Sequence, residues 1–511
     1  QANNTRYAQD NEDVGSNGAS HISKLTGGSA GAAGVIFQKS DSKNITIDKY
    51  SGNTMVIYEH DNSNPEKILG GNFTVKTAET GSAVALRTDS SGVNTSSEAT
   101  VNKVLDALAN KLYYTDYVNG SRNLDGQVQI AEGLTAASAA KYVGSVKYSD
   151  TTGQGSLGEK ISVQTETPEG DNSDADKNFL VEKGDWHGNN SGDNVNLTLK
   201  DKASWSGDNI GSNMVVNAAD SVWTGDNKGA GTNVTLNASA WNGKNDGSKA
   251  VVTLKNKASW SGDNSGSDLQ LNLDDSDYNG NISGDRSSVT LGNGSNWEGN
   301  SSGKDAVINI NNGSSWSGNV SGSGSTLNMH GDNLWQVKGD NVLDSFNAGS
   351  ISKMRKAAAV AAGGGTTVDM TDATAGNLTI NKYNGKATFV YQHDVNDVTK
   401  INGGDITIGT ATTGSGITLL TDSNGLETTN KYAINDALNA LANKLYYTGY
   451  LNGEKNLDGY VKIAEGLTSA SATKFAGNIG YDSKTGQGSL DKATVDYGTS
   501  IPNVQSKTDF K

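Results

Sequence analysis

Residues 251–262, VVTLKNKASWSG, contain the unit that determines the fold of this chain. Val252 and Leu254 alternate with polar residues, which is the pattern of a strand with one buried face. Trp260 follows Leu254 after six residues, and Gly262 follows two residues later. The same arrangement recurs along the middle of the chain, so this segment is one unit of a repeat.

All eight tryptophans of the protein belong to this repeat. They are Trp186, Trp205, Trp223, Trp241, Trp260, Trp297, Trp316 and Trp335. Neighbouring members are 18 or 19 residues apart, except for one 37-residue gap whose midpoint is Tyr278, so the series has nine members. A strand that returns at this interval predicts one solenoid coil per repeat.

The repeated aromatic position has two structural interpretations. In a solenoid the same position stacks on itself about 4.8 Å away in the next coil, so a column of indoles would fill the core, each pair adding about 0.5–1.5 kcal/mol beyond area burial. Facing outward, the same column would form a platform for sugar rings. The small neighbours Ala203, Ala258 and Gly207 favour the core.

The composition is consistent with a solenoid. Of the 511 residues only 34% are hydrophobic, with 64 glycines and 3 prolines, which is more polar than a compact α/β enzyme. A solenoid needs only a thin inward row in each coil, and the regular strand pattern argues against disorder.

Charge and cysteine content exclude several classes of partner and site. A net charge of −15 repels phosphate backbones, so we expect no nucleic-acid partner. The absence of cysteine excludes disulfides and thiolate metal sites. No apolar run approaches the ~20 residues that cross a membrane. The N-terminus lacks a secretion-signal pattern, so an exported protein would be a mature or excised fragment.

The tryptophan repeat, called the ladder below, is flanked by two copies of one sequence. Residues Asn44–Leu157 reappear at Asn377–Leu490 with a constant offset of 333, and the LANKLYYT motif at 108–115 is identical in both copies. The chain therefore divides into flank module A (residues 1–176), the tryptophan ladder (177–340) and flank module A′ (341–511).

Each flank combines short strand patterns with one helix. The strand patterns lie at Ile45–Ile47, Met55–Tyr58, Phe73–Val75 and Ala83–Leu86, and we expect them to continue the coil. Helical spacing joins Val101, Val104, Leu105, Leu108 and Leu112, with Ser96 or Ser97 as N-cap. The copy uses Ile434, Leu438, Leu441 and Leu445, preceded by Thr428 or Thr429.

Further elements are predicted in the connections. A second short helix is expected at Ala136–Tyr142 and at Ser469–Phe475. Glu166–Asp176 is acidic and rich in turn residues, which predicts a loop. Lys353–Gly365 is either a helical turn or a loop, and Tyr497–Lys511 begins another polar connection.

A polar row follows the aromatics at a distance of three residues. Its members are Asn189, Asp208, Asp226, Lys244, Asp263, Asn281, Asn300 and Asn319. Asn and Asp at this point predict turn chemistry. The alternative is a row of calcium sites, which Lys244 and the lack of a glycine-rich nonapeptide disfavour.

No catalytic, cofactor or metal residue is assigned from the sequence, and the binding residues stay unassigned. His60 and His393 occupy one position of the two copies, and we predict structural side chains with satisfied rings. Asp274, Asp275 and Asp277 are the best enzymatic candidates because glycosidases place two carboxylates about 5–9 Å apart. A solvated turn is the plainer interpretation. Nucleophile elbows and phosphate loops are absent from the sequence.

The ladder, with its strand, Asn/Gly turn and aromatic in every ~19-residue repeat, resembles the passenger domains of Gram-negative type V autotransporter adhesins of the AIDA/antigen-43 kind. This resemblance implies a right-handed parallel β-helix displayed outside the bacterium. It also implies self-association or host binding, with heptose on Ser or Thr residues. The sequence departs from that family in its helix-bearing flanks and in lacking a translocator-barrel pattern.

The fold class we predict is therefore an all-β, right-handed parallel β-helix with two helical excursions. We predict a non-enzymatic adhesin, without cofactors, on the outer surface of a bacterial cell. Its partners would be a glycan or protein of a host or bacterial surface, or the same chain on a neighbouring cell, and the helices would be the docking points. The alternatives are a polysaccharide-degrading enzyme and a purely structural surface-coat spacer.

Overall fold

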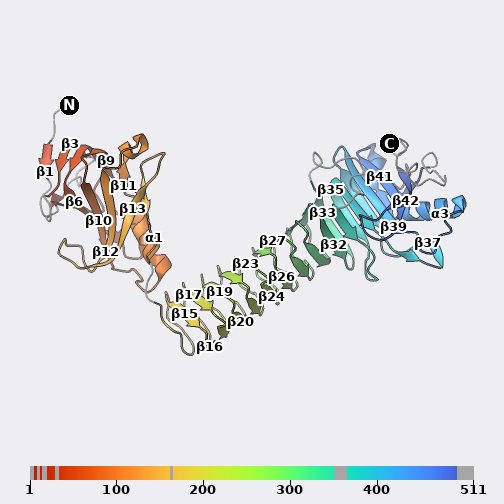
Figure 1. The fold of residues 1–511 in the computed structure, drawn as a ribbon, viewed down its shortest axis with the longest axis horizontal. Coiled ribbons are helices and arrows are strands. Elements are labelled where there is room, and N and C mark those ends of the chain that lie inside the picture. Colours follow the sequence, from red (N-terminus) through yellow and green to blue (C-terminus); the bar gives the residue numbers. More distant parts are fainter. Residues whose placement is uncertain are drawn as a thin grey trace. The chain divides into compact units, whose positions relative to one another are not determined.

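The computed structural model describes residues 5–7, 12–13, 20–28, 34–161, 165–349 and 365–491. The chain forms two compact units, one of residues 1–166 with 176–178 and the other of residues 167–175 with 179–511 (Figure 1). Most of the connection predicted at 353–365 and all of the segment at 497–511 lie outside the described residues.

The first unit is built from two sheets that enclose an apolar core. A parallel five-stranded sheet has the order β1-β3-β5-β9-β11, and a seven-stranded sheet has the order β14-β13-β12-β10-β6-β4-β2. The bounds are β1 Thr5–Tyr7, β2 Glu12–Asp13, β3 Ser20–Thr26, β4 Gly34–Gln38, β5 Ile45–Ser51, β6 Asn53–Tyr58, β7 His60–Asp61, β8 Asn64–Ile68, β9 Phe73–Ala78, β10 Ser82–Asp89, β11 Leu112–Tyr114, β12 Leu124–Ala131, β13 Ala140–Tyr148 and β14 Gly155–Leu157. Ile45, Ile47, Phe73, Val84 and Leu86 are buried in this core.

Helix α1 (Glu98–Ala109) closes the core of the first unit. The Ser97 hydroxyl accepts a hydrogen bond from the Thr100 amide at 3.2 Å, so one of the two predicted N-caps is confirmed. The prediction that Leu112 continues the helix was wrong. The helix ends at Ala109, and Leu112 lies in β11, buried opposite Phe73.

The ladder is a parallel solenoid in which each coil contributes one strand to each of two rows. Row 1 consists of β15 Asn178–Glu182, β17 Asn196–Lys200, β19 Val215–Ala219, β21 Asn233–Asn237, β23 Val251–Lys255, β25 Gln270–Asp274, β27 Ser288–Gly292, β29 Val307–Asn311 and β31 Thr326–His330. Row 2 carries the aromatics on β16 Asp185–His187, β18 Ser204–Ser206, β20 Val222–Thr224, β22 Ala240–Asn242, β24 Ser259–Ser261, β26 Asp277–Asn279, β28 Asn296–Glu298, β30 Ser315–Gly318 and β32 Asn333–Val337. Coils are numbered 1 to 9 here, from Trp186 to Trp335.

A third corner of each coil is held by single bridges, such as Asn209 to Asn227. Within the two rows, like residues pair with like residues in parallel register: Trp205 with Trp223, and Val216 with Val234. The predicted class, an all-β parallel solenoid with a coil of 18–19 residues, is confirmed.

Flank module A′ continues the solenoid without a break in its hydrophobic core (Figure 1). Its elements are β33 Asn341–Ala348, β34 Thr366–Asp369, β35 Leu378–Val390, β36 His393–Asp394, β37 Asp397–Ile401, β38 Ile406–Ala411, β39 Ser415–Asp422, α3 Lys431–Ala442, β40 Leu445–Tyr447, β41 Leu457–Ala464, β42 Thr473–Tyr481 and β43 Gly488–Leu490. Short 3-10 turns follow β11 and β40, at Thr115–Asn119 and Thr448–Asn452.

The ends of helix α3 differ from the prediction. Its N-cap is Asn430, whose side chain accepts from the amides of Tyr432 and Ala433, rather than Thr428 or Thr429. Leu445 lies in β40 rather than in the helix. Asn has a cap propensity at least equal to that of Thr and stands directly before the first helical residue.

The second short helix predicted in each flank is absent from its described segment. Residues 136–142 and 469–475 form a turn followed by β13 and β42, which pair antiparallel with β12 and β41. In the first unit, the Arg87 guanidinium donates to the carbonyls of Thr135, Ala136 and Ser138 at 2.7–3.1 Å. These carbonyls are therefore used by a side chain instead of by a helical turn.

Within the described ranges, no helix has both the length and the apolar character needed to cross a membrane. The loop predicted at 166–176 is confirmed, since its residues form only isolated bridges.

Candidate binding surface

The tryptophan column lies in the core. All eight indoles and Tyr278 are at most 1% exposed, and the rings of Trp223 and Trp241 stack with centroids 4.5 Å apart and planes 1° apart. Each indole Nε1 donates to a glycine carbonyl of the preceding coil, as Trp241 does to Gly225 at 2.9 Å. The prediction of an internal stack is confirmed. The buried aromatic rings are therefore not accessible to a ligand.

The glycine two residues after eight of the nine aromatics, all except Trp335, is required by the close approach of neighbouring coils. A Cβ on Gly225 would lie 1.8 Å from the carbonyl oxygen of Gly207. This carbonyl also accepts the Trp223 Nε1 hydrogen at 2.9 Å, so the glycine makes room for both the coil contact and the indole bond.

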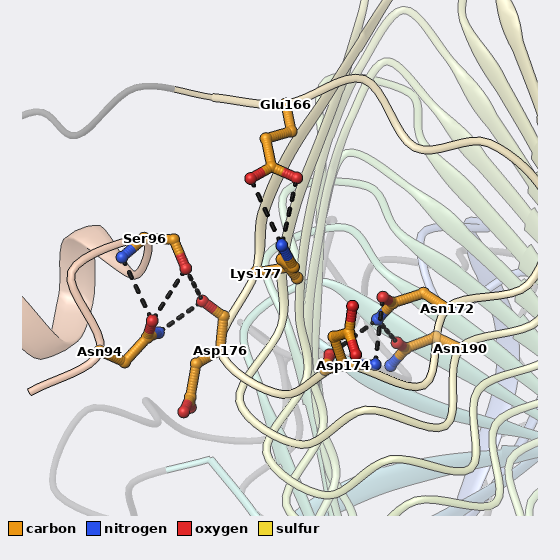
Figure 2. Close-up of polar contacts among 8 residues, drawn as sticks. All are labelled: Asn94, Ser96, Glu166, Asn172, Asp174, Asp176, Lys177 and Asn190. Atoms are coloured by element: carbon orange, nitrogen blue, oxygen red, sulfur yellow. Dashed lines mark hydrogen bonds and ion pairs between the residues drawn. The ribbon is translucent and has the colours of Figure 1, made fainter. Parts of the chain in front are cut away.

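A buried asparagine column, which we did not predict, runs beside the tryptophans. Its members are Asn172, Asn190, Asn209, Asn227, Asn245 and Asn264. Each Nδ2 donates to the Oδ1 of the next member at 2.6–2.8 Å, and Figure 2 shows the first pair, Asn172 and Asn190. The sequence signal was an Asn four residues after consecutive tryptophans, one position beyond the polar row that contains Asn189 and Asp208.

The polar row three residues after the aromatics ties one coil to the next. The Oδ1 of Asn189 accepts from the Asp208 amide at 2.9 Å, and that of Asp208 accepts from the Asp226 amide at 2.8 Å. The predicted turn chemistry, in which each side chain bonds its own backbone, was wrong: these bonds go to amides of the following coil, and no residue of the row has a left-handed conformation. In the described part of the chain, no group of three or more His, Cys, Asp or Glu side chains is placed to hold a metal ion.

The loop before the ladder is anchored at both of its ends. The Asp176 carbonyl accepts from Asn94 Nδ2 at 2.5 Å and from the Ser96 hydroxyl at 2.7 Å (Figure 2). Lys177 Nζ lies 3.4 Å from a Glu166 carboxylate oxygen (Figure 2). This partly exposed ion pair contributes little to stability, and the partly buried contacts to the Asp176 carbonyl fix the end of the loop.

His60 and His393 are structural, as predicted. Nε2 of His60 lies 2.5 Å from the Ser91 carbonyl, which only accepts, so this nitrogen carries a hydrogen. Nδ1 lies 2.7 Å from the Thr88 hydroxyl, and both contacts recur around His393 with Asn424 and Thr421. Both ring nitrogens are therefore engaged by the protein in each copy.

The three clustered carboxylates lie on an exposed turn. Asp274 accepts a hydrogen bond from Asn293 at 2.7 Å, and Asp277 accepts one from Asn296 at 3.0 Å. Asp275 holds a left-handed turn conformation with φ 47°. The plainer interpretation, a solvated turn tied to the next coil, accounts for all three residues.

The two helices have a packing role. The apolar faces of α1 and α3, including Leu105 and Leu438, are fully buried against their own modules. Their outward faces remain predicted docking points.

A recess opens on the ladder where rows 1 and 2 are joined. The recess encloses about 920 Å³ and runs across coils 1 to 5. It is lined by Lys183, Asp201, Lys202, Asp220, Ser221, Val222, Ala238, Ser239, Ala240, Lys257 and Ser259. Because all of these residues lie on successive coils, the recess is elongated along the solenoid axis.

The cause of the recess is a difference in coil length. In coils 2 and 5 the tryptophan is the sixth residue after the last buried row-1 residue, whereas in coils 3 and 4 it is the fifth. The longer turns use two left-handed residues, such as Asp201 and Lys202 with φ 56° and 65°, and the shorter ones use one, Asp220 or Ala238 with φ 48°. The recess lies over the two adjacent short turns.

Module A′ contains a buried lysine that module A does not. In module A, Gln129 accepts from Arg87 Nε at 2.9 Å and from Nη2 at 2.7 Å. The same positions of module A′ carry Lys462 and Leu420. Lys462 is 8% exposed and makes no hydrogen bond or ion pair with the described residues, and burial lowers the pKa of its ammonium group to about 8.

The stability of the second unit is predicted to rise between about pH 8 and pH 10.5 because of Lys462. Its pKa in the folded protein lies below the ordinary value, so in this window the unfolded chain binds more protons. Below this window the penalty for burying the charge is complete, and above it the penalty is gone. Lys462→Met should remove the slope and stabilise the protein at neutral pH by about 3 kcal/mol.

Guanidinium unfolding followed by circular dichroism at several pH values tests this prediction. Lys400→Met, which removes an exposed lysine of the same module, is the control and should keep the slope. An unchanged pH dependence in Lys462→Met would show that the ammonium is solvated in the folded protein.

No known protein family matches the chain, and no relative is found among curated proteins. The fold and surface together define a parallel β-solenoid with an aromatic core, a polar exterior and a recess on the described part of its ladder.

Proposed function

We propose that this chain is a non-enzymatic attachment protein on the outer surface of a bacterial cell, which binds through many weak polar contacts repeated along its solenoid. The observation that carries the proposal is a row of uncharged polar side chains at the outward middle position of the row-1 strands. On the row-1 strands β17 to β31 its members are Thr198, Asn217, Thr235, Thr253, Asn272, Thr290, Asn309 and Asn328, and Asn347 of β33 continues the row.

Parallel register sets the spacing of this row. Each member pairs directly with the next, so the side chains repeat about every 4.8 Å. Several are oriented by bonds along the row: Asn328 Nδ2 donates to Asn309 Oδ1 at 2.9 Å, and Asn347 Nδ2 donates to Asn328 Oδ1 at 2.7 Å. A partner therefore meets an ordered array of donors and acceptors with little loss of side-chain entropy.

The chemistry of the row supports repeated weak binding. Amides and hydroxyls offer both donors and acceptors, and each exposed contact contributes little in water. Repetition on a rigid scaffold turns weak contacts into strong attachment because later contacts form at a high effective concentration. The partners we propose are a glycan or protein of a host or bacterial surface, or the same chain on a neighbouring cell. The resemblance to autotransporter adhesins is consistent with this proposal.

Clumping of cells or beads that display the chain tests the proposal. Replacing Thr235, Asn272 and Asn309 by Glu places like charges on the row, and clumping or attachment should be lost. The control replaces Thr224, Asn242 and Asn279, exposed residues of the row-2 strands, by Glu, and should retain it. Polysaccharide cleavage without clumping, or equal loss in both variants, would contradict the proposal.

A further inference from the structure

We infer that the recess over coils 1 to 5 of the ladder binds a linear anionic polysaccharide along the solenoid axis. This inference rests on the proposed attachment function and names the class of ligand that one part of the surface recognises.

The shape of the recess fits an extended polymer. Four strand spacings separate the first coil from the fifth, which is about 19 Å along the axis, and the lining follows the coils from Lys183 to Ser259. The recess is a surface depression, so a chain longer than the depression is able to enter and leave at both ends. A compact small molecule would leave most of this length unfilled.

The charges in the recess favour an anion. Lys183, Lys202 and Lys257 are exposed residues of its wall, and their ammonium groups form no ion pair or hydrogen bond with the described residues. Together with Asp201 and Asp220, the lining has a net charge of +1, obtained from three lysines and two aspartates, in a chain whose net charge is −15. An ammonium group donates charge-assisted hydrogen bonds to carboxylates and sulfates.

The two aspartates favour a polymer whose charges are spaced apart. The carboxylates of Asp201 and Asp220 repel a ligand with a charge on every unit, but they accept hydrogen bonds from hydroxyl groups. An acidic polysaccharide carries both groups, anionic substituents for the lysines and free hydroxyls for the aspartates.

The backbone around the recess leaves no edge for a peptide strand. The amides of Val222, Ala240 and Ser259 donate to the carbonyls of Ala203, Ser221 and Ser239, each at 3.0 Å. Peptides that bind by strand addition need unpaired backbone groups, and these are used between coils. Recognition therefore depends on side chains.

The floor of the recess fits sugar rings rather than nucleic-acid bases. Val222, which is 38% exposed, pairs with Ala240 of the next coil, and Ala238 lines the same recess, so these apolar groups suit the C–H faces of sugars. The hydroxyls of Ser221 and Ser239 donate to the carbonyls of Ala219 and Asn237 at 2.8 Å and accept from the amides of Ala203 and Ser221 at 3.2 and 3.0 Å, so these buried side chains are held within the coils and shape the floor of the recess. The described lining has no aromatic ring, whereas proteins bind single-stranded nucleic acid by stacking bases on such rings.

Binding of soluble polysaccharides to the purified full chain tests the inference without any cell or bead attachment. The probes are polygalacturonate (carboxylated), dextran sulfate (sulfated), neutral dextran and a single-stranded oligonucleotide, measured by calorimetry at low and physiological salt. We expect at least one anionic polysaccharide to bind, with affinity falling as salt rises, and neutral dextran and the oligonucleotide to bind far more weakly.

Two variants locate the site. Lys202→Gln with Lys257→Gln should lower the affinity about tenfold or more, because each removes a hydrogen bond to a charged group. Ala240→Phe should lower it to a similar extent by filling the recess while leaving the charge unchanged. The matched control, Lys228→Gln with Lys244→Gln, removes the same charge from exposed residues outside the lining and should bind like the unmodified chain.

The outcomes separate this inference from the proposed function. Equal losses of affinity in the recess variants and the control variant, or tighter binding of the oligonucleotide than of the polysaccharides, would overturn the polysaccharide site. So would an absence of binding by both anionic polysaccharides. Clumping that disappears only in the row-1 variants would still support attachment in that case, whereas polysaccharide binding without any clumping would support the recess and contradict the attachment function.

Discussion

Replacing Trp241 with alanine is expected to destabilise the middle of the ladder by about 3–5 kcal/mol, the range observed for buried tryptophan truncations. Trp241 is fully buried in coil 4 and stacks on Trp223 at 4.5 Å and on Trp260 at 4.6 Å. The change removes both stacking contacts and leaves the Gly225 carbonyl without its indole donor. The neighbouring coils cannot close the cavity, because parallel pairing on both sides fixes their spacing.

The loss should appear locally as well as globally. Solenoid stability is approximately a sum of coil and interface contributions, so a cavity in coil 4 weakens the two interfaces that it shares with coils 3 and 5. Amide hydrogen exchange should become faster in β20, β22 and β24, and guanidinium unfolding should shift to lower concentration. Asn242→Ala, one residue away on the exposed side, is the control and should change stability by less than about 0.5 kcal/mol.

Coil 6 shows which smaller replacement the column tolerates. Tyr278 takes the aromatic position there, and its hydroxyl donates to the Gly262 carbonyl at 2.9 Å, replacing the indole bond. Trp241→Tyr should therefore cost less than Trp241→Phe, by roughly 1 kcal/mol for the recovered hydrogen bond. Equal stability of the two variants would show that ring volume alone determines the effect.

The repeat made the ladder predictable. A fixed interval between aromatics, a preceding pair such as Val252 and Leu254, and small residues around the ring all indicate one parallel coil with an internal stack. These features reinforce one another in every coil, so a departure such as Tyr278 did not obscure the pattern. The duplicated flanks gave two copies of the longer helix signal, and both of these helices are present.

The features that were missed depend on contacts between segments distant in sequence. Leu112 and Leu445 continue a helical apolar face, but pairing with Phe73 and Ile406 places them in strands. The second short helix was lost to an antiparallel hairpin, whose carbonyls in module A bind Arg87 from a neighbouring strand. Helical periodicity contains no information about such partners, so tertiary contacts determined the secondary structure of these short segments.

The recess illustrates a different limit of prediction from the sequence. The alternation of 18 and 19 residues was visible in the sequence, but the position of the missing residue within the coil was not interpreted. Only the turns between rows 1 and 2 vary in length, which places Asp220 and Ala238 in shortened turns between the longer turns at Lys202 and Lys257. A variation in coil length becomes a binding surface because two short turns are adjacent.

The asparagine column provides the second large expected effect. Asn227 lies at its centre: it accepts from Asn209 Nδ2 at 2.8 Å and donates to Asn245 Oδ1 at 2.7 Å. It also accepts from the Gly229 amide at 3.3 Å and donates to the Gly229 carbonyl at 3.0 Å. Its side chain is fully buried, so water cannot replace these partners when the amide is removed.

Asn227→Ile is expected to destabilise the ladder by about 2–6 kcal/mol, because it leaves the Gly229 amide and Asn245 Oδ1 as two buried unpaired groups at about 1–3 kcal/mol each. Ile occurs naturally at the equivalent position of coil 6, where Ile282 follows the last member of the column. An aliphatic side chain therefore fits the space, and the cost arises from lost hydrogen bonds rather than from a clash.

The matched comparison is Asn264→Ile at the end of the column. Asn264 accepts from Asn245 at 2.6 Å and donates to the Gly266 carbonyl at 2.9 Å, but the next coil supplies no amide partner. Its replacement breaks one link of the column instead of two and should cost about half as much. Guanidinium unfolding with hydrogen exchange at the amides of Gly211, Gly229 and Gly247 measures both variants. Equal costs at the centre and at the end would show that each Asn acts within its own turn and that the column has no collective contribution.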